Sequence, residues 1–471
     1  MILANRRLRL ASSLALLIAA SVLVAPSHSS TPVAQAADPK PSVLFIITDD
    51  QRAETLPAME TVTNEIVEKG INFKKGFVSN PLCCPSRATA LTGEYSHTNG
   101  VYRNGPPFGG WDAFEPHETS TLATWLDPTH ETGLFGKYFN SFRTAGANGH
   151  VPDGWDRFVA FPAPHYYDYQ LDMDGVVHNF GSAPADYSTN VIANEAVDFI
   201  EGTTEPVFVW FAPFAPHNPA TPAPGDRHAF DDLPDWRPRN YNEADVSDKP
   251  GWVRSIPLMT RADQRAQDKY RERQFESLQS ADRAIADILG ALQDTGRLSN
   301  TLIVYTTDQG VAWGEHRWGH RKKVAWEEIV RVPFVVRFDP LITQPRSDRH
   351  LVVNIDFAPT IVDPLVTDVA APPMDGTSLV PLFDDPSSPW RSEFLLEYKE
   401  KDSANNPAPP TYCGIRTAKY KYVDYLIGKS ELYNLDKDPF ELHNLIGKPG
   451  GAAVVSTLQP KLDALCSPPP P

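Results

Sequence analysis

The residues best suited to chemistry in this chain of 471 residues lie in the stretch Pro81–Gly93. Two adjacent cysteines, Cys83 and Cys84, precede Arg87. Residues 87–91 predict a short helix, because a Pro-Ser pair suits its first turn and a glycine its end. Cys83 would then lie just ahead of a helix N-terminus, where unpaired N–H groups and the helix dipole favour an anion. Arg87 adds a rigid fork of donors for a tetrahedral oxyanion.

Adjacent cysteines also have interpretations that involve no catalysis. Free cysteine is among the most buried residue types, so both could be small apolar core residues. Each could instead form a disulfide with Cys413 or Cys466, the other two cysteines of the chain. Zinc is disfavoured, because no third and fourth ligands lie at zinc-finger spacing. The residues of this stretch alone leave these alternatives open.

An acidic pair follows the first strand that the sequence predicts. Ser42–Thr48 is an apolar run of strand length, typical of a strand buried on both faces, and it ends in Asp49 and Asp50. The carboxyl ends of such strands are where open α/β sheets place their sites. A lone aspartate there would suggest a turn or a helix cap. Two adjacent buried carboxylates instead indicate a cation, and hard oxygen ligands suit Ca²⁺ or Mg²⁺.

The same layout recurs far along the chain. Residues 300–307 form another run typical of a buried strand, and this run ends in Asp308 and Gln309. Two neighbouring strands that both end in oxygen ligands would supply a single divalent-cation site. The two groups of acids therefore predict that these strands lie side by side.

The cysteine stretch resembles the signature of the type I (formylglycine-dependent) sulfatases, in which Cys-x-Pro-Ser-Arg is followed by Leu-Thr-Gly. The matching residues are Cys83, Pro85, Ser86, Arg87, Leu91, Thr92 and Gly93. The resemblance implies that a formylglycine-generating enzyme oxidises Cys83 to Cα-formylglycine, with Cys84 at the variable position. Sulfatases also carry an Asp-Asp pair about as far before the cysteine motif as here. The matches run over most of the chain.

The resemblance assigns the cation, expected to be Ca²⁺ with Mg²⁺ as the alternative, to five residues. They are Asp49, Asp50, Cys83, Asp308 and Gln309. The family most often has Asp-Asn-Gly at the second acidic motif, where this chain has glutamine in place of asparagine. Glutamine keeps the carbonyl oxygen and adds a methylene.

The resemblance also implies cationic residues around the sulfate. Lys137 matches the lysine of a Gly-Lys-(Trp/Tyr) segment, with Phe139 where many sulfatases have a histidine. His217 matches a Pro-His segment, and the register to Trp326-Glu327 selects Lys322, with Lys323 as the alternative. The implied catalytic residues are Cys83, Arg87, Lys137, His217, Lys322 and a pocket residue, His316.

A sulfate monoester needs its leaving oxygen protonated and its charge held while sulfur is attacked. A thiol or single hydroxyl would remain as a stable sulfated enzyme, whereas hydrated formylglycine carries two hydroxyls on one carbon. We therefore expect one hydroxyl to attack sulfur. Loss of the other hydroxyl's proton then expels sulfate and regenerates the aldehyde. Arg87, Lys137, His217 and Lys322 would stabilise the oxyanion and the leaving group.

The elements that must position these residues predict an α/β protein. Residues 207–211 add a buried strand, and residues 260–292 predict a long helix with core positions at helical spacing. The resemblance implies an alkaline-phosphatase-like large sheet flanked by helices, with a small C-terminal antiparallel sheet plus one helix. Strands of that small sheet are expected at 393–398, 414–417 and 420–425. The predicted organisation is a signal peptide at 1–36, a catalytic sulfatase domain at 37–383 and a C-terminal subdomain at 384–471.

Two stretches read as loops. Residues 100–190 are rich in aromatics, glycine and proline and show little periodicity, which predicts long loops around a pocket rather than a second core. Within them, Val101–Asn104 and Tyr167–Leu171 resemble the N-acetylglucosamine-6-sulfatase branch and related extracellular endosulfatases, and aromatics there would stack on a sugar. Residues 218–260 are rich in proline and aspartate, typical of an inserted loop.

The N-terminus predicts export. Three arginines precede the apolar run Leu10–Ala25, and Ala34-Gln35-Ala36 follows, which is the pattern of a secretory signal. The apolar run is shorter than the roughly 20 residues of a membrane span. We therefore expect a secreted protein, extracellular or periplasmic, with no stable membrane span. If Cys83 is modified, Cys413 and Cys466 are the natural disulfide pair in such a protein.

The net charge of the chain argues against one class of partner. The formal charge of −16 makes non-specific nucleic-acid binding unfavourable, so no nucleic-acid partner is expected. The predicted function is a sulfuric ester hydrolase that acts on a sulfated sugar, glucosamine-6-sulfate-like, or on an aryl sulfate. The alternatives are a phosphomonoester or phosphonate hydrolase of the same superfamily, which commonly has a Ser/Thr nucleophile and two metals, and a secreted non-catalytic glycan-binding protein.

Overall fold

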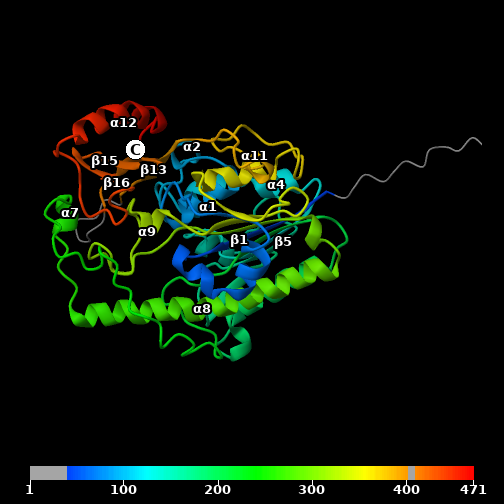
Figure 1. Ribbon diagram of the computed structural model, residues 1–471. Helices are drawn as coiled ribbons and strands as arrows, with labels where there is room; N and C mark the ends of the chain where they lie inside the picture. Colours follow the sequence, from blue (N-terminus) through cyan, green and yellow to red (C-terminus); the bar gives the residue numbers. More distant parts are fainter. Residues whose placement is uncertain (1–39, 401–408) are drawn as a thin grey trace, which may run out of the picture. The chain divides into compact units, whose positions relative to one another are not determined.

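The computed structural model describes residues 40–400 and 409–471 (Figure 1). The predicted signal peptide at residues 1–36 lies outside this part of the chain. Among the described residues, none of the helices combines the length and apolar character that crossing a bilayer requires.

A central trio of parallel strands organises the main sheet. β1 (Ser42–Thr48) lies between β9 (Thr301–Thr307) and β8 (Val207–Ala212), and all three strands are buried along their whole length. Thr48 is the register partner of Thr307, so β1 and β9 end at the same level. The acids that follow the two strands must therefore emerge side by side, as the sequence predicts.

The described part of this sheet has ten strands, in the order β11-β2-β10-β9-β1-β8-β4-β5-β6-β7. On the β8 side, β4 (Glu131–Gly136) and β5 (Arg157–Ala160) continue the parallel set, and β6 (Tyr169–Met173) and β7 (Val176–Phe180) form an antiparallel hairpin. On the β9 side lie β10 (Phe334–Arg337), β2 (Ile71–Phe73) and β11 (Arg346–Asp348).

The prediction of long loops for residues 100–190 is wrong, because β4 to β7 all fall in that stretch. These strands are short, and the segments between them contain glycine and proline, so no single stretch is long enough to show a clear periodicity. Two of the aromatics expected to stack on a sugar, Tyr102 and Tyr169, are instead buried.

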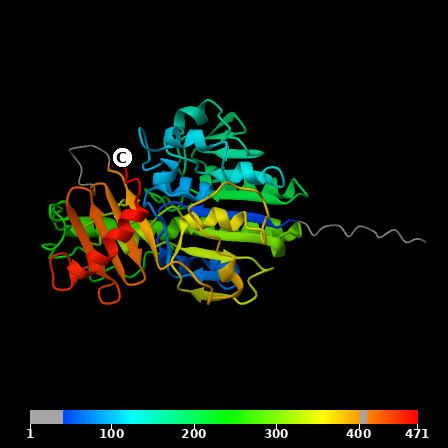
Figure 2. The same ribbon diagram turned by 90° about the horizontal axis from the view of Figure 1, so that it is seen from above.

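Helices cover both faces of the sheet (Figures 1 and 2). Alternate residues of β1 point to opposite faces. On one face they pack with α1 (Cys83–Thr92), α4 (Leu122–Leu126) and α10 (Phe357–Ile361). On the other they pack with α6 (Ser188–Glu201) and the long α8 (Arg261–Asp294). The structure confirms a large sheet flanked by helices.

The small C-terminal sheet is also confirmed. Its four antiparallel strands are β13 (Glu393–Tyr398), β14 (Tyr412–Thr417), β15 (Tyr420–Tyr425) and β16 (Lys429–Asn434), with α12 (Gly451–Leu465) packed against β13 and β14. Figure 2 shows this unit beside the main sheet. The predicted domain boundary at residue 384 stays a prediction.

The remaining elements are short. They are η1 (Ala53–Ala58), η2 (Val62–Val67), β3 (Gly76–Phe77), α2 (Ser96–Asn99), α3 (Trp111–Phe114), η3 (Glu115–His117), α5 (Arg143–Ala147), η4 (Pro184–Asp186), α7 (Gly251–Arg254), η5 (Leu298–Asn300), α9 (Glu327–Val330), β12 (Val352–Val353), η6 (Asn354–Asp356) and α11 (Pro381–Asp384). Residues 218–260 hold only α7, in agreement with the predicted inserted loop.

A disulfide joins Cys413 on β14 to Cys466 just after α12. Cys83 and Cys84 are buried and free, so neither takes part in the alternative pairings that the sequence left open. The disulfide closes a loop with a sequence separation of 53 residues. It therefore holds α12 onto the small sheet.

We expect removal of this disulfide by the double substitution Cys413→Ala and Cys466→Ala to lower the free energy of unfolding by about 4 kcal/mol, because the unfolded chain regains the entropy of the open loop. Urea denaturation followed by circular dichroism would measure the change. The Cys84→Ala variant, which loses a thiol but no disulfide, is the control. An unchanged urea midpoint in the double variant would contradict the expectation.

Candidate active site

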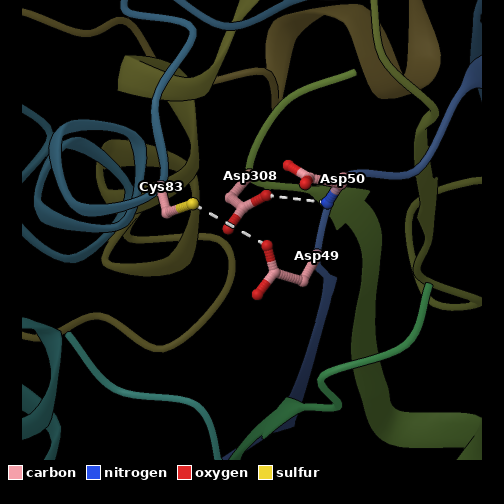
Figure 3. Close-up of side chains that lie close together, drawn as sticks. All are labelled: Asp49, Asp50, Cys83 and Asp308. Atoms are coloured by element: carbon pink, nitrogen blue, oxygen red, sulfur yellow. Dashed lines mark hydrogen bonds between the residues drawn. The ribbon is translucent and has the colours of Figure 1, made fainter. Parts of the chain in front are cut away.

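Three aspartates and a cysteine converge at the carboxyl ends of β1 and β9. Asp49 and Asp50 follow β1, Asp308 follows β9, and the backbone N–H of Asp50 donates to Asp308 Oδ1 at 3.1 Å. One ligand atom from each acid and Cys83 Sγ all lie within 4.8 Å of one another, and all four residues are buried. Figure 3 shows these side chains gathered at one point. The prediction that the two acid groups meet is confirmed.

Cys83 reaches this cluster from the first turn of α1. The helix predicted from residue 87 begins at Cys83 itself, with Leu82 in extended conformation before it, and ends at Gly93 with φ 72°. Pro85 is tolerated in the first turn because its missing N–H has no partner there. The Cys83 thiol lies 3.8 Å from Asp49 Oδ1. Burial raises the pKa of this thiol, so an unmodified Cys83 is no thiolate nucleophile at neutral pH.

Three cations face the three acids. Lys137, just after β4, pairs with Asp49. Arg87 donates from Nε and Nη2 to Asp308 Oδ2 at 3.0 and 2.9 Å. Each of these pairs is buried, which requires that both charges be satisfied.

Lys322 is the cation closest to the cysteine. Its Nζ lies 2.7 Å from Asp50 Oδ1 and 2.9 Å from Cys83 Sγ. Burial opposes its charge, but Asp50 and its other anionic neighbours outweigh burial and raise the pKa of Lys322 well above its usual value. Lys322 therefore carries a positive charge beside Cys83 at neutral pH.

Asp49 and Asp50 are ionised because their positive neighbours outweigh the effect of burial. Burial would raise the pKa of Asp49, but the charges of Lys137 and His217 outweigh it and lower the pKa to about 2. Burial likewise opposes ionisation of Asp50, and Lys322 lowers its pKa. Asp49 and Asp50 are therefore carboxylates, the form that binds a cation, across the physiological pH range.

His217 lies next to the acid cluster and is partly exposed. It follows β8, and its Nδ1 lies 2.8 Å from the carbonyl oxygen of Asn218, so Nδ1 carries the hydrogen. Its Nε2 lies 3.6 Å from Asp50 Oδ2, and its side chain is 28% exposed. The ring thus presents Nε2 both to the buried acids and to entering molecules.

Gln309 supplies a test of whether a cation fits. Its side-chain N–H group donates to Asp50 and, at 3.6 Å, to Cys83 Sγ. Its side-chain carbonyl oxygen is buried and has no hydrogen-bond partner among the described residues. Such an orphaned oxygen beside three carboxylates is suited to a hard divalent cation. The residues present therefore fit the predicted metal site.

The structure does not bring His316 to this cluster. Its Nδ1 lies 2.6 Å from Glu243 Oε2, its Nε2 accepts from Asn240 Nδ2 at 3.2 Å, and its ring packs on Trp326. Burial lowers the pKa of His316, but the hydrogen bond with Glu243 outweighs burial and raises it. His316 thus holds the loop that carries Lys322 rather than contacting the acids.

The sequence analysis missed the contribution of α8 to the site. The helix was predicted to be plain core, yet Gln274 Nε2 donates to the backbone carbonyls of Asp50 at 3.2 Å and Pro216 at 3.3 Å. Tyr270, one turn earlier, is close enough that burial and, next, the charge of Asp50 raise its pKa well above the usual value. The available signal was a glutamine directly beside the apolar face of the helix.

Comparison with known proteins places this arrangement in a class. A family profile described as "Sulfatase" matches residues 41–365, and one described as "N-sulphoglucosamine sulphohydrolase, C-terminal" matches residues 314–467. The first match covers most of the chain and defines the class as that of the sulfatases.

Relatives agree over most of the chain. Human N-acetylglucosamine-6-sulfatase is 31% identical over 451 residues, covering 86% of this chain and 81% of that protein. An arylsulfatase of Chlamydomonas reinhardtii is 31% identical over 480 residues, covering 88% and 73% of the two chains. The chain belongs to the sulfatase family and is an enzyme, as its signature predicts, and membership supports hydrolysis of a sulfate ester.

Solved structures share the fold. One described as a complex with the substrate D-glucosamine-2-N,6-O-disulfate matches with a TM-score of 0.75 at 24% identity, covering 90% of this chain and 96% of that one. A phosphonate monoester hydrolase of Agrobacterium radiobacter matches with a TM-score of 0.71 at 20% identity, covering 91% and 96%. These likenesses extend to the whole architecture.

We expect Lys322→Met to lower kcat for a sulfate ester at least about 100-fold, because it removes the fixed positive charge 2.9 Å from Cys83 Sγ. Steady-state kinetics with 4-nitrophenyl sulfate would measure the loss. Arg321→Gln is the matched control, since Arg321 is exposed and lies over the Trp318 ring, 5.1 Å from its centroid. Equal effects of the two substitutions would contradict a role for Lys322.

Proposed function

We propose that this enzyme removes sulfate from a sulfated sugar, glucosamine-6-sulfate-like, or from an aryl sulfate, by means of formylglycine formed at Cys83. The single observation that supports it best is the position of the Cys83 side chain. Its Sγ stands where the oxygens of the converted side chain would lie, within 4.8 Å of ligand atoms on three acids and 2.9 Å from Lys322.

Charge explains why the ligand should be an anionic ester. The three carboxylates of the cluster are offset by Arg87, Lys137 and Lys322. A divalent cation held by the same carboxylates would leave the site with an excess of positive charge. A sulfate monoester supplies the complementary negative charge.

A divalent cation and the formylglycine at Cys83 would supply the chemistry that ordinary side chains lack. Asp49, Asp50, Asp308 and the carbonyl oxygen of Gln309 would hold Ca²⁺, with Mg²⁺ as the alternative, and the cation would polarise oxygens bound to it. Converted and hydrated, Cys83 would supply two hydroxyls on one carbon, one to attack sulfur and one whose loss of a proton lets sulfate leave.

The side chains around them then have separate tasks. Lys137 and Lys322 hold the negative charge of the sulfate oxygens, and Arg87 fixes Asp308 in place. His217, whose Nε2 faces both the acids and the opening, gives a proton to the leaving oxygen of the alcohol.

The relatives guide the choice of substrate. The relatives at 31% identity include an N-acetylglucosamine-6-sulfatase and an arylsulfatase, whose names match the two substrate types proposed here. The disulfide suits an exported protein, and some relatives at 30–31% identity are called extracellular sulfatases, which supports secretion. Maturation by a formylglycine-generating enzyme is part of the same proposal.

The rival within the superfamily is a phosphomonoester or phosphonate hydrolase with two metals. Among residues 40–400 and 409–471, one cluster, made of three aspartates and Cys83, is tight enough to hold an ion. One candidate cation site instead of two favours the sulfatase.

We expect the peptide that spans Cys83 to be lighter than its unmodified form by the difference between H₂S and O, and Cys83→Ala to release no sulfate. Mass spectrometry and sulfate release from 4-nitrophenyl sulfate would measure both. Cys84→Ala is the matched control, because Cys84 is the adjacent buried thiol and contacts Asn140 rather than the acids.

The same assay separates the rivals. Faster turnover of 4-nitrophenyl phosphate than of the sulfate would favour the phosphatase, and an intact thiol at Cys83 with no turnover would favour a glycan-binding protein. Either result would refute the proposed function.

We expect dialysis against a chelator to abolish sulfate release and to lower the melting temperature by a few degrees, because a cation that binds only the folded state stabilises it by about 3 kcal/mol at a hundredfold excess over its dissociation constant. Differential scanning calorimetry would follow the melting temperature, and added Ca²⁺ should restore both properties better than Mg²⁺. Identical melting curves before and after dialysis would argue against a resident cation.

A further inference from the structure

A second positively charged site lies beside the proposed active site. A cavity of about 310 Å³ is lined by Arg227 and His228 of the loop after β8, and by Lys269 and Arg273 of α8. Lys269 and Arg273 are four residues apart and so share one face of the helix. A cluster of four basic residues is notable in a chain whose net charge is −16.

Two of these side chains have donors to spare. Among the described residues, the side chains of Arg227 and Arg273 take part in no hydrogen bond or ion pair, and both residues are exposed. His228 pairs with Asp231 at 2.9 Å, and Lys269 pairs with Glu272 at 2.7 Å and with Asp231 at 3.3 Å. Neither guanidinium therefore has an anionic partner among the described residues, and both are available to an anionic ligand.

The one acid in the lining does not serve that purpose. Glu276 is buried, and its Oε1 accepts the backbone N–H of His228 at 2.7 Å. It fixes the loop to α8. The guanidinium groups are left facing the cavity, with the planar fork that suits a sulfate or carboxylate.

The cavity is tied to the leaving-group side of the active site. The carbonyl oxygen of His217 accepts the N–H of Ala220 at 2.8 Å, a turn that keeps the next residue, Thr221 of the cavity lining, within roughly 11 Å of His217 between Cα atoms. Tyr166 donates to the carbonyl oxygen of His217, and Tyr187 to that of Thr221, at 2.7 and 2.8 Å. The two sites therefore keep a fixed spacing.

Helix α8 provides a second link. Gln274, which binds the backbone of Asp50, directly follows Arg273. One helix thus contacts the acid cluster with one residue and the cationic cavity with its neighbour.

We propose that this cavity is a subsite for a second anionic group, a sulfate or carboxylate, of a polyanionic sulfated glycan whose sulfate ester lies at Cys83. The inference rests on the proposed function. His217 protonates the leaving oxygen, so the rest of the glycan extends past His217 and toward Arg227 and Arg273. The enzyme then distinguishes a multiply charged chain from a small sulfate ester.

The test compares the wild type with the double variant Arg227→Gln, Arg273→Gln. With a heparin-derived tetrasaccharide that carries a terminal 6-sulfated glucosamine, we expect KM to rise roughly tenfold and kcat to stay unchanged, because charge-assisted hydrogen bonds are lost. With 4-nitrophenyl sulfate, which is too small to reach the cavity, both constants should keep their wild-type values. Arg349→Gln, which changes an exposed arginine after the edge strand β11, is the control for net charge.

The outcomes separate the two proposals. A loss with both substrates means a structural role for the arginines, and a KM for the tetrasaccharide equal to that of the control overturns the subsite. If the wild type hydrolyses neither substrate, the proposed function fails. Titration calorimetry would then still test the subsite, by comparing the affinity of Cys83→Ala for the tetrasaccharide with and without the double substitution. Equal affinities, or no binding, would refute the subsite on their own.

Discussion

The active site depends on the mutual neutralisation of charges buried between the ends of β1 and β9. Asp49, Asp50 and Asp308 are almost wholly buried. Their partners Lys137 and Arg87 are equally buried, and Lys322, the partner of Asp50, is 15% exposed. Removing one partner of such a pair leaves an uncompensated charge in a low dielectric, a penalty of about 3–5 kcal/mol. The surrounding fold must therefore keep all six charged groups in place together.

Strand register meets most of this requirement. β1 and β9 pair residue for residue through Thr48 and Thr307, and the chain then turns sharply. Asp50 adopts the left-handed conformation with φ 65°, which aspartate tolerates better than most residues. In this conformation the backbone N–H of Asp50 donates to Asp308, and the carboxylate of Asp50 accepts from Lys322. Such local strain persists only where neighbouring contacts fix it, and here those contacts are the functional groups themselves.

Gly310 shows how closely the second acidic loop is packed. A Cβ at this position would lie 2.5 Å from the carbonyl oxygen of Glu328, so only glycine lets the chain pass. The constraint explains why the residue after Gln309 lacks a side chain. It also holds the carbonyl oxygen of Gln309 inside the cluster rather than in solvent.

Much of this arrangement is encoded locally, and that part could be predicted. Buried strands that end in acids reveal themselves by composition, so the pairing of β1 with β9 and the meeting of their acids followed from the sequence. The sequence says much less about which residues of a loop face the acid cluster. His316 lies in a stretch that matches the family, yet its contacts with Glu243 and Asn240 come from an inserted loop that no local pattern connects to it.

Helix α8 shows the other limit of sequence analysis. Periodicity reports which face of a helix is apolar, and it correctly predicted the packing of Leu278 and Ile285 in the core. It cannot report what lies opposite a polar residue at the border of that face. Gln274 is such a residue: its amide holds the backbone of both Asp50 and Pro216, and its carbonyl oxygen accepts from Trp313 at 2.5 Å. A long helix that stabilises the core therefore also sets the distance between the loop that carries Asp49 and Asp50 and the segment that carries His217. The arrangement of Asp50 and His217 is thus coupled to the packing of α8 against its face of the sheet.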